Sequence, residues 1–166
     1  MQIVVIAAKS SNHVIGKDND LVWNLPADQA FFEAQIKDSI LLSGRRSFES
    51  PQGTSLFQNN PNVIVLTSQE DYEAGKARVA SSLEQAIDLA KQLPPDRLSI
   101  LGGSSIYKKG MDYADKLIIT EVHEIFEGDS FFPEISTSVW KEVWREDHQK
   151  DPENPYDYSF VIYERQ

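Results

Sequence analysis

The strongest constraint on the fold is an unbroken apolar run over residues 3–8, near the start of the chain. A strand that faces water on one side alternates apolar and polar residues, whereas a strand covered on both faces is apolar throughout. This run therefore predicts a central strand with helices on both of its faces. Because parallel sheets are covered in this way, the run favours an α/β fold.

Four shorter runs of the same kind follow along the chain. Helix-like or loop segments separate them, which is the alternation expected of parallel strands joined by crossover connections. The predicted strands cover residues 40–43, 62–67, 98–101 and 117–122. Together with the first run they predict a mostly parallel sheet.

Between the first two strands, residues 26–37 have a helical pattern. Phe31, Phe32 and Ile36 share one face of this helix, and Pro26 stands in a first-turn position that tolerates proline. We therefore predict a helix here, with its apolar face toward the core.

A second helix is predicted to start at Ser81 or Ser82. Glu84 stands three residues after the first serine and Gln85 three after the second, so the sequence fits a capping box in either register. Apolar residues on one stripe follow, which supports the helix.

The C-terminal part has a different pattern. Residues 140–146 and 156–163 flank a turn-rich stretch at 151–155, which predicts an antiparallel hairpin. Core packing is the better explanation for Trp140 and Trp144, which share a face on either a helix or a strand. No stretch resembles an interdomain linker, so residues 1–166 are interpreted as a single domain.

Composition excludes several functions. A net charge of -10 and a pI near 4.7 argue against binding to nucleic acid or to an anionic membrane. There is no cysteine, so disulfides and thiolate nucleophiles are excluded. The three histidines show no metal-ligand spacing, and we predict no metal site. The apolar N-terminal run is too short to cross a bilayer and lacks the basic start of a secretory signal, so we expect a cytoplasmic protein. We also expect a monomer.

Asp28 is the first candidate functional residue. Phe31, Phe32, Gln35 and Ile36 follow it by three, four, seven and eight positions, so this carboxylate shares the apolar helix face. An acidic residue in a first helical turn can also simply complement the helix dipole. If the carboxylate faces a pocket, burial raises its pKa and it can bind an amidine-like group, such as the edge of a pterin.

Two glycine-containing turns are candidate phosphate sites. In the first, a strand ends at Gly44 and passes through Arg45, Arg46 and Ser47 into a helix start, where free N–H groups and two cations attract anions. A solvated arginine pair on a surface turn is the alternative. In the second, residues 101–107 run from a strand through Gly102-Gly103 toward a helix, although a tight turn explains paired glycines equally well.

In order and spacing, these motifs resemble the dihydrofolate reductase family. The resemblance rests on Val14-Ile15-Gly16, Trp23-Asn24-Leu25-Pro26-Ala27-Asp28, the run 44–50, Leu101-Gly102-Gly103 with Ile106-Tyr107, Thr120, and Glu127-Gly128-Asp129 with Phe132-Pro133. It covers essentially the whole chain. It implies an eight-stranded sheet with an antiparallel C-terminal hairpin, about four flanking helices, and a cleft shared by folate and NADPH.

The resemblance also implies roles for individual residues. Asp28 would hold the amino-pyrimidine edge of the pterin, Thr120 would support that carboxylate, and Trp23 would help to organise an ordered water. The substrate ring would contact Ile6, Asp28, Phe32, Leu101 and Thr120. NADPH would contact Ala8, Ile15, Gly16, Gly44, Arg45, Arg46, Ser47, Leu66, Thr67, Ser68, Gly102, Gly103, Ser104, Ser105, Ile106 and Tyr107. A cis peptide is implied between Gly102 and Gly103, and residues 16–21 resemble an active-site lid.

The implied reaction is hydride transfer from NADPH to C6 of 7,8-dihydrofolate with protonation at N5. This chain departs from the family pattern at residues 51–54 and 58–61, where an arginine that grips the glutamate tail of folate is missing and Asn60 stands instead. Gln29 and Ser105 replace a more usual apolar and a more usual basic residue. A pyrimidine or tail-less pterin reductase of the same fold, or a non-catalytic nucleotide-binding protein, are the alternatives.

Overall fold

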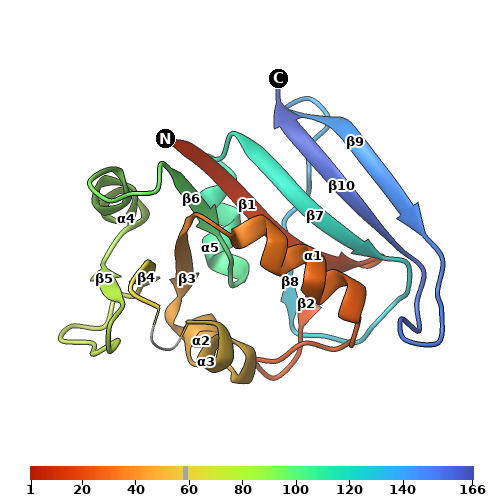
Figure 1. Ribbon diagram of the computed structural model, residues 1–166, viewed down its shortest axis with the longest axis horizontal. Helices are drawn as coiled ribbons and strands as arrows, with labels where there is room; N and C mark the ends of the chain where they lie inside the picture. Colours follow the sequence, from red (N-terminus) through yellow and green to blue (C-terminus); the bar gives the residue numbers. More distant parts are fainter. Residues whose placement is uncertain (58–59) are drawn as a thin grey trace.

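A computed structural model describes residues 1–57 and 60–166 of the chain. Most of the strands form one eight-stranded sheet in the order β5-β4-β3-β6-β1-β7-β10-β9, and a small two-stranded sheet pairs β2 with β8 (Figure 1). The strands are β1 Gln2–Ser10, β2 Val14–Gly16, β3 Ile40–Gly44, β4 Val63–Leu66, β5 Arg78–Ala80, β6 Arg97–Ile100, β7 Lys116–Val122, β8 Ser130–Phe131, β9 Trp140–His148 and β10 Tyr158–Arg165. The helices are α1 Pro26–Ile36, α2 Arg45–Phe48, α3 Pro51–Phe57, α4 Leu83–Lys91 and α5 Ser104–Gly110.

Pairing within the large sheet confirms the predicted topology. β1 pairs in parallel with both β6 and β7, and the series continues in parallel through β3, β4 and β5. β10 is antiparallel to β7 and to β9, which forms the predicted C-terminal hairpin. In the described part of the chain five helical segments accompany the sheet, where about four helices were expected, and the shortest of them, α2, has four residues.

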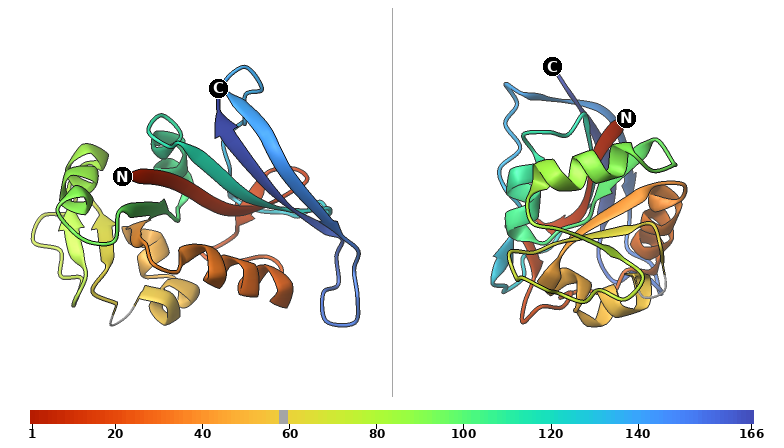
Figure 2. Two further views of the ribbon diagram at one scale, coloured as in Figure 1. Left: turned by 45° about the horizontal axis from the view of Figure 1, so that its top comes forward. Right: turned by 90° about the vertical axis from the view of Figure 1, so that its left-hand side faces the viewer.

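Both faces of the sheet are covered, as the doubly apolar first strand requires. On one face, Val5 and Ala7 pack in a cluster that includes the apolar side of α4. On the other face, Val4 and Ile6 pack beneath the aromatic residues of α1. The tilted view in Figure 2 (left) shows α1 and α3 below the sheet and α4 and α5 above it.

The structure decides the capping register of α4. Ser82 is the N-cap, and its hydroxyl accepts a hydrogen bond of 3.1 Å from the backbone N–H of Gln85. The Gln85 side chain in return accepts a hydrogen bond of 2.7 Å from the backbone N–H of Ser81. The start of this helix is therefore fixed by the second of the two registers that the sequence allowed.

One prediction for the hairpin is wrong. Trp140 is buried, but Trp144 is 40% exposed and does not belong to the core. The register of β9 against β10 shifts beside Ile162 and Tyr163, which face Trp144 and Glu142, so that Val143 is an extra residue. A β-bulge of this kind reverses the alternation of side chains, and the two tryptophans lie on opposite faces.

Residues 51–54, which depart from the family pattern, form the start of α3. α3 packs tightly on α2, and a Cβ on Gly53 would lie 2.7 Å from the carbonyl oxygen of Phe48. Gln58 and Asn59 lie outside the described residues. Across the described ranges, no helix has the length and apolar character needed to cross a membrane, and no group of three acidic or histidine side chains could hold a metal ion.

Candidate functional site

A cleft of about 760 Å³ lies at the carboxyl ends of the parallel strands, between α1, α3 and the turn before α5. Neighbouring strands send their connections away in different directions at this edge, which leaves a crevice. Twelve of the predicted site residues line the cleft together: Ile6, Ala8, Ile15, Gly16, Asp28, Phe32, Ser47, Leu101, Gly103, Ser104, Tyr107 and Thr120. They come from six separate elements and from the loops that follow them.

Asp28 lies in the first turn of α1 and lines this cleft. None of the residues of α1 is fully buried, so the helix face that carries Asp28, Phe31, Phe32 and Ile36 borders the cleft instead of packing wholly into the core as predicted. Burial raises the pKa of the Asp28 carboxyl above its ordinary value, and the Thr120 side chain opposes this with a smaller lowering. The raised pKa distinguishes this carboxyl from an acid that merely complements a helix dipole.

Tyr107 holds the strand ends together beneath the cleft. Its hydroxyl lies 2.8 Å from the carbonyl oxygen of Ile6 and 2.9 Å from that of Leu101, and can donate to either one. Burial raises the pKa of Tyr107, and the nearby charge of Asp28 adds a smaller increase. The tyrosine is therefore a neutral donor that lies between β1 and the residue that follows β6.

The two glycine-containing turns meet each other. The backbone N–H of Gly44 donates a hydrogen bond of 2.7 Å to the carbonyl oxygen of Gly102. Gly102 has a φ of 109°, and a Cβ there would lie 3.0 Å from the Tyr107 ring. A Cβ on Gly103 would lie 3.1 Å from the Ser47 hydroxyl oxygen, and the Gly102–Gly103 peptide is cis as the resemblance implied. Glycine at these positions lets backbone from two loops approach one point.

The remaining predicted cofactor residues do not line the cleft. Arg45 pairs with Glu49 at 2.9 Å, and Arg46 beside it is exposed. The others lie at or after the carboxyl ends of β3, β4 and β6, some of them in the first turn of α5, and they are Gly44, Leu66, Thr67, Ser68, Gly102, Ser105 and Ile106. They do not share the cleft wall with Asp28.

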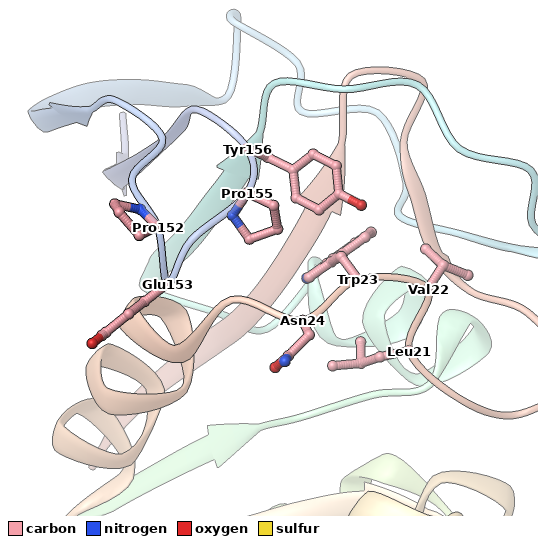
Figure 3. Close-up of a pocket in the computed structure, with 8 residues that line it drawn as sticks. All are labelled: Leu21, Val22, Trp23, Asn24, Pro152, Glu153, Pro155 and Tyr156. Carbon is pink, nitrogen blue, oxygen red and sulfur yellow. The ribbon is translucent and has the colours of Figure 1, made fainter.

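Trp23 also lies outside the cleft, in a neighbouring hollow of about 450 Å³. Figure 3 shows this hollow between residues 21–24, which precede α1, and residues 152–156 of the hairpin turn. Trp23 is buried against the Phe126 ring, and its Nε1–H has no hydrogen-bond acceptor among the described residues.

Sequence reasoning missed one wall of the cleft. It consists of α3 with the residue before it, and the lining side chains there are Ser50, Pro51, Gln52, Gly53, Ser55, Leu56 and Phe57. Their sequence has neither charge nor clear periodicity, so no local signal marked them. Asp20 and Glu33 also line the cleft, although Asp28 was the one ionisable residue that the resemblance placed there.

The predicted lid lies over the same end of the cleft. Gly16, Asn19, Asp20 and Leu21 line it, and the Asn19 side-chain amide donates a hydrogen bond of 2.8 Å to the carbonyl oxygen of Arg46. This bond joins the lid segment to the start of α2.

Comparison with known proteins agrees with this geometry. The sequence model of the dihydrofolate reductase family matches residues 2–165. This chain belongs to the dihydrofolate reductase family. The dihydrofolate reductase of Bacillus subtilis (strain 168) is 42% identical over 163 residues, which cover 98% of this chain and 94% of the relative. That of Staphylococcus haemolyticus is 35% identical over 99% of this chain and 96% of its own.

A solved structure shows the same fold. It is dihydrofolate reductase from Enterococcus faecalis in complex with NADP(H) and RAB-propyl, with a TM-score of 0.86 and 36% identity over 99% of this chain and 96% of that chain. The chain is accordingly an oxidoreductase of the dihydrofolate reductase type, whose cofactor is NADPH. The predicted fold class, family and cofactor are confirmed.

Proposed function

We propose that this chain reduces 7,8-dihydrofolate to 5,6,7,8-tetrahydrofolate and that Asp28 binds the substrate and promotes its protonation. The observation that carries the proposal is a carboxyl with a raised pKa on the wall of a 760 Å³ cleft, beside Phe32 and Thr120. A carboxylate can accept two parallel hydrogen bonds from the ring N–H and amino group of a pterin. The apolar side chains around it suit the faces of the same ring.

The residues around the glycine turns fit a phosphate-rich dinucleotide. Backbone at Gly44 and Gly103 approaches closely, and a Cβ at either position would crowd Ile106 or Ser47. Arg45 and Arg46 supply positive charge in an otherwise acidic protein. We propose that these loops hold the phosphates of NADPH, with Ala8, Ile15 and Gly16 near its nicotinamide. NADPH supplies the hydride that is transferred to C6 of the pterin.

The protein must also supply a proton to N5 of the substrate. We propose that this proton comes from water and that Asp28, in its ionised form, stabilises the pterin once it is protonated. Thr120 orients the Asp28 carboxyl, since its side chain acts on that pKa. The buried Nε1–H of Trp23 is free to donate to a water molecule, and we propose that it positions one for proton delivery.

The lid residues 16–21 are proposed to close over the reacting atoms and exclude water. Support comes from the bond between the Asn19 side chain and Arg46, which connects the lid to the proposed cofactor site.

We propose that the enzyme acts as a monomer. Its net charge of -10 argues against nucleic acid as a partner.

The test is a steady-state assay that follows loss of NADPH absorbance on addition of dihydrofolate. We expect saturable oxidation that depends on both compounds and that is weaker with NADH. A chain that binds NADPH but gives no oxidation with any dihydropterin would be a nucleotide-binding protein, and the proposed function would be wrong.

A further inference from the structure

The cleft has an unusual charge distribution for a site whose substrate carries carboxylates. The charged side chains among its described lining residues are Asp20, Asp28 and Glu33, and no lysine, arginine or histidine is among them. Asp28 lies beside the proposed ring site, which leaves Glu33 on the part of α1 that extends beyond it. The cleft therefore has no cation, within the described residues, to meet an anionic substituent.

The wall opposite α1 supplies no charge either. Residues 50–69 contain no charged residue at all, and this run includes α3 and its lining side chains. Gln58 and Asn59, which lie outside the described residues, belong to the same uncharged run by sequence. Asn60 uses its side-chain oxygen to accept a hydrogen bond of 2.9 Å from the backbone N–H of Asn62. Asn60 is not among the lining residues, and the polar side chains that this wall presents to the cleft are Ser50, Gln52 and Ser55, which are all uncharged.

Glu33 is held at the rim of the cleft by a neighbour. The Gln29 amide donates a hydrogen bond of 3.1 Å to its carboxylate, and both side chains line the cleft. An amide orients the carboxylate without neutralising it. The last turn of α1 has no basic residue, so the negative end of the helix dipole adds to this charge.

The position of Glu33 matches the reach of the substrate side chain. It stands five residues after Asp28, which is about 7.5 Å along the helix axis. If the nicotinamide lies at the glycine turns and the lid, as proposed, the C6 substituent of a ring bound at Asp28 leaves between α1 and α3, which form the remaining walls of the cleft. An aminobenzoyl-glutamate substituent is long enough to bring its carboxylates to the Glu33 end.

Resting on the proposed function, we propose that this cleft selects dihydropterins whose C6 substituent carries no negative charge. Glu33 is the specificity-determining residue, since it repels carboxylates at the outer end of the cleft. Dihydrofolate is then a substrate because of its ring and benzoyl group, and its glutamate carboxylates oppose binding. Further glutamates on the substrate weaken binding again, because each adds negative charge near an acidic protein.

The test compares dihydrofolate with its diamide, in which both glutamate carboxylates are replaced by carboxamides of nearly the same shape. We expect the diamide to have the higher kcat/KM by about two- to fivefold at low ionic strength, the size of an exposed charge interaction. Added KCl should reduce this difference by screening. Higher kcat/KM for dihydrofolate than for the diamide would overturn the proposal.

Variants at Glu33 test whether this residue causes the difference in kcat/KM between the two substrates. E33Q should bring the ratio of kcat/KM for the diamide to kcat/KM for dihydrofolate toward one. E33K should reverse this ratio, so that dihydrofolate becomes the better substrate. D88K is the matched control, because it changes the net charge equally but lies on the exposed side of α4, across the sheet. An equal change of the ratio in D88K and E33K would overturn the assignment to Glu33.

Lys37 directly follows α1 and is the nearest cation along that helix. K37Q should leave the ratio unchanged, and a selective loss of dihydrofolate activity in K37Q would instead reveal a cationic clamp. Kd values of both ligands, from quenching of tryptophan fluorescence, are measured in parallel. If the diamide binds more tightly than dihydrofolate but neither compound is turned over, the proposed function is wrong and the proposed selectivity is supported.

Discussion

Three carboxylates border the same cleft, and their surroundings assign them different roles. Asp20 and Glu33 are exposed, whereas Asp28 is half-buried between the sheet and α1 and has a raised pKa. A carboxyl with a raised pKa lies closer to the pH at which the enzyme works, which suits a group that exchanges protons with a bound ring. The chemistry therefore depends on the burial of one residue and not on residue type.

Asp28→Asn should lower turnover at neutral pH by at least about a hundredfold, because general acid catalysis contributes roughly this much. The amide cannot stabilise a protonated ring. Activity that remains should rise as the pH falls, since solvent then protonates the substrate. Steady-state kcat over a range of pH measures both effects, and a circular dichroism spectrum like that of the wild type shows that folding is intact. Near wild-type turnover at pH 7 would contradict the role of Asp28.

Gly102→Ala should destabilise the protein and weaken NADPH binding. The φ of 109° disfavours alanine, and its Cβ would meet the Tyr107 ring at 3.0 Å, so we expect a loss of about 1–3 kcal/mol in unfolding free energy. Gly75→Ala is the matched control, because its φ is also positive, at 63°, and no atom of the described residues lies within 4 Å of a Cβ there. Urea unfolding and NADPH titration of both variants separate the backbone effect from the steric one. Equal behaviour of the two variants would contradict the steric part.

At the scale of single elements, local sequence signals and tertiary contacts contribute unequally. α4 has both a cap and an apolar stripe, and its predicted position is confirmed. α3 has neither signal, and it depends on the close approach to α2 that Gly53 permits. The bulge at Val143 in β9 is likewise set by pairing with β10, which no local pattern of β9 reveals.

Ser82→Ala should lower the unfolding free energy by about 1 kcal/mol, the usual effect of removing an N-cap side chain. Its hydroxyl accepts a hydrogen bond from the Gln85 backbone N–H, which would lose its partner. Ser81→Ala removes an exposed side-chain contact to the same glutamine and should cost less. Urea denaturation midpoints of the two variants give the comparison, and a larger loss in Ser81→Ala would mean that the other register caps α4.

Over the whole molecule, stability and activity oppose each other at Asp28. A carboxyl whose pKa is raised by folding binds more protons in the folded state than in the unfolded state. The free energy of unfolding therefore falls as the pH rises from the unfolded pKa through the folded pKa, and it stays lower above that window. Asp28 therefore lowers the unfolding free energy at neutral pH, although it supplies the proton-binding group that the cleft needs.

Asp28→Asn should consequently raise the unfolding free energy at neutral pH while turnover falls. Relative to the wild type, this gain should shrink as the pH is lowered and vanish below about pH 3.9, where the carboxyl is protonated in both states. Denaturant unfolding of the two proteins at several pH values tests the prediction. A variant that is less stable than the wild type at pH 7 would contradict the burial of a charged Asp28 as the main effect.

The resemblance to the family supplied the twelve predicted residues that line the cleft. The patterns of the sequence by themselves determined the fold class, the mostly parallel sheet implied by doubly apolar strands, and the helix carrying Asp28. These features depend on periodicity and on glycine, proline and capping residues, which act over a few positions in the chain. Local patterns could also place Glu33 and Gln29 on α1, but not the wall that faces them.

Only the tertiary structure decided which side chains are buried and which charges lie close to one another. The raised pKa of Asp28 depends on burial and on Thr120, and the charge of the outer cleft depends on Glu33 facing an uncharged α3. Trp144 is exposed because a bulge reverses its face. Desolvation, Coulomb interactions and strand register each depend on residues that are distant in the sequence, so no short segment of the chain reveals them.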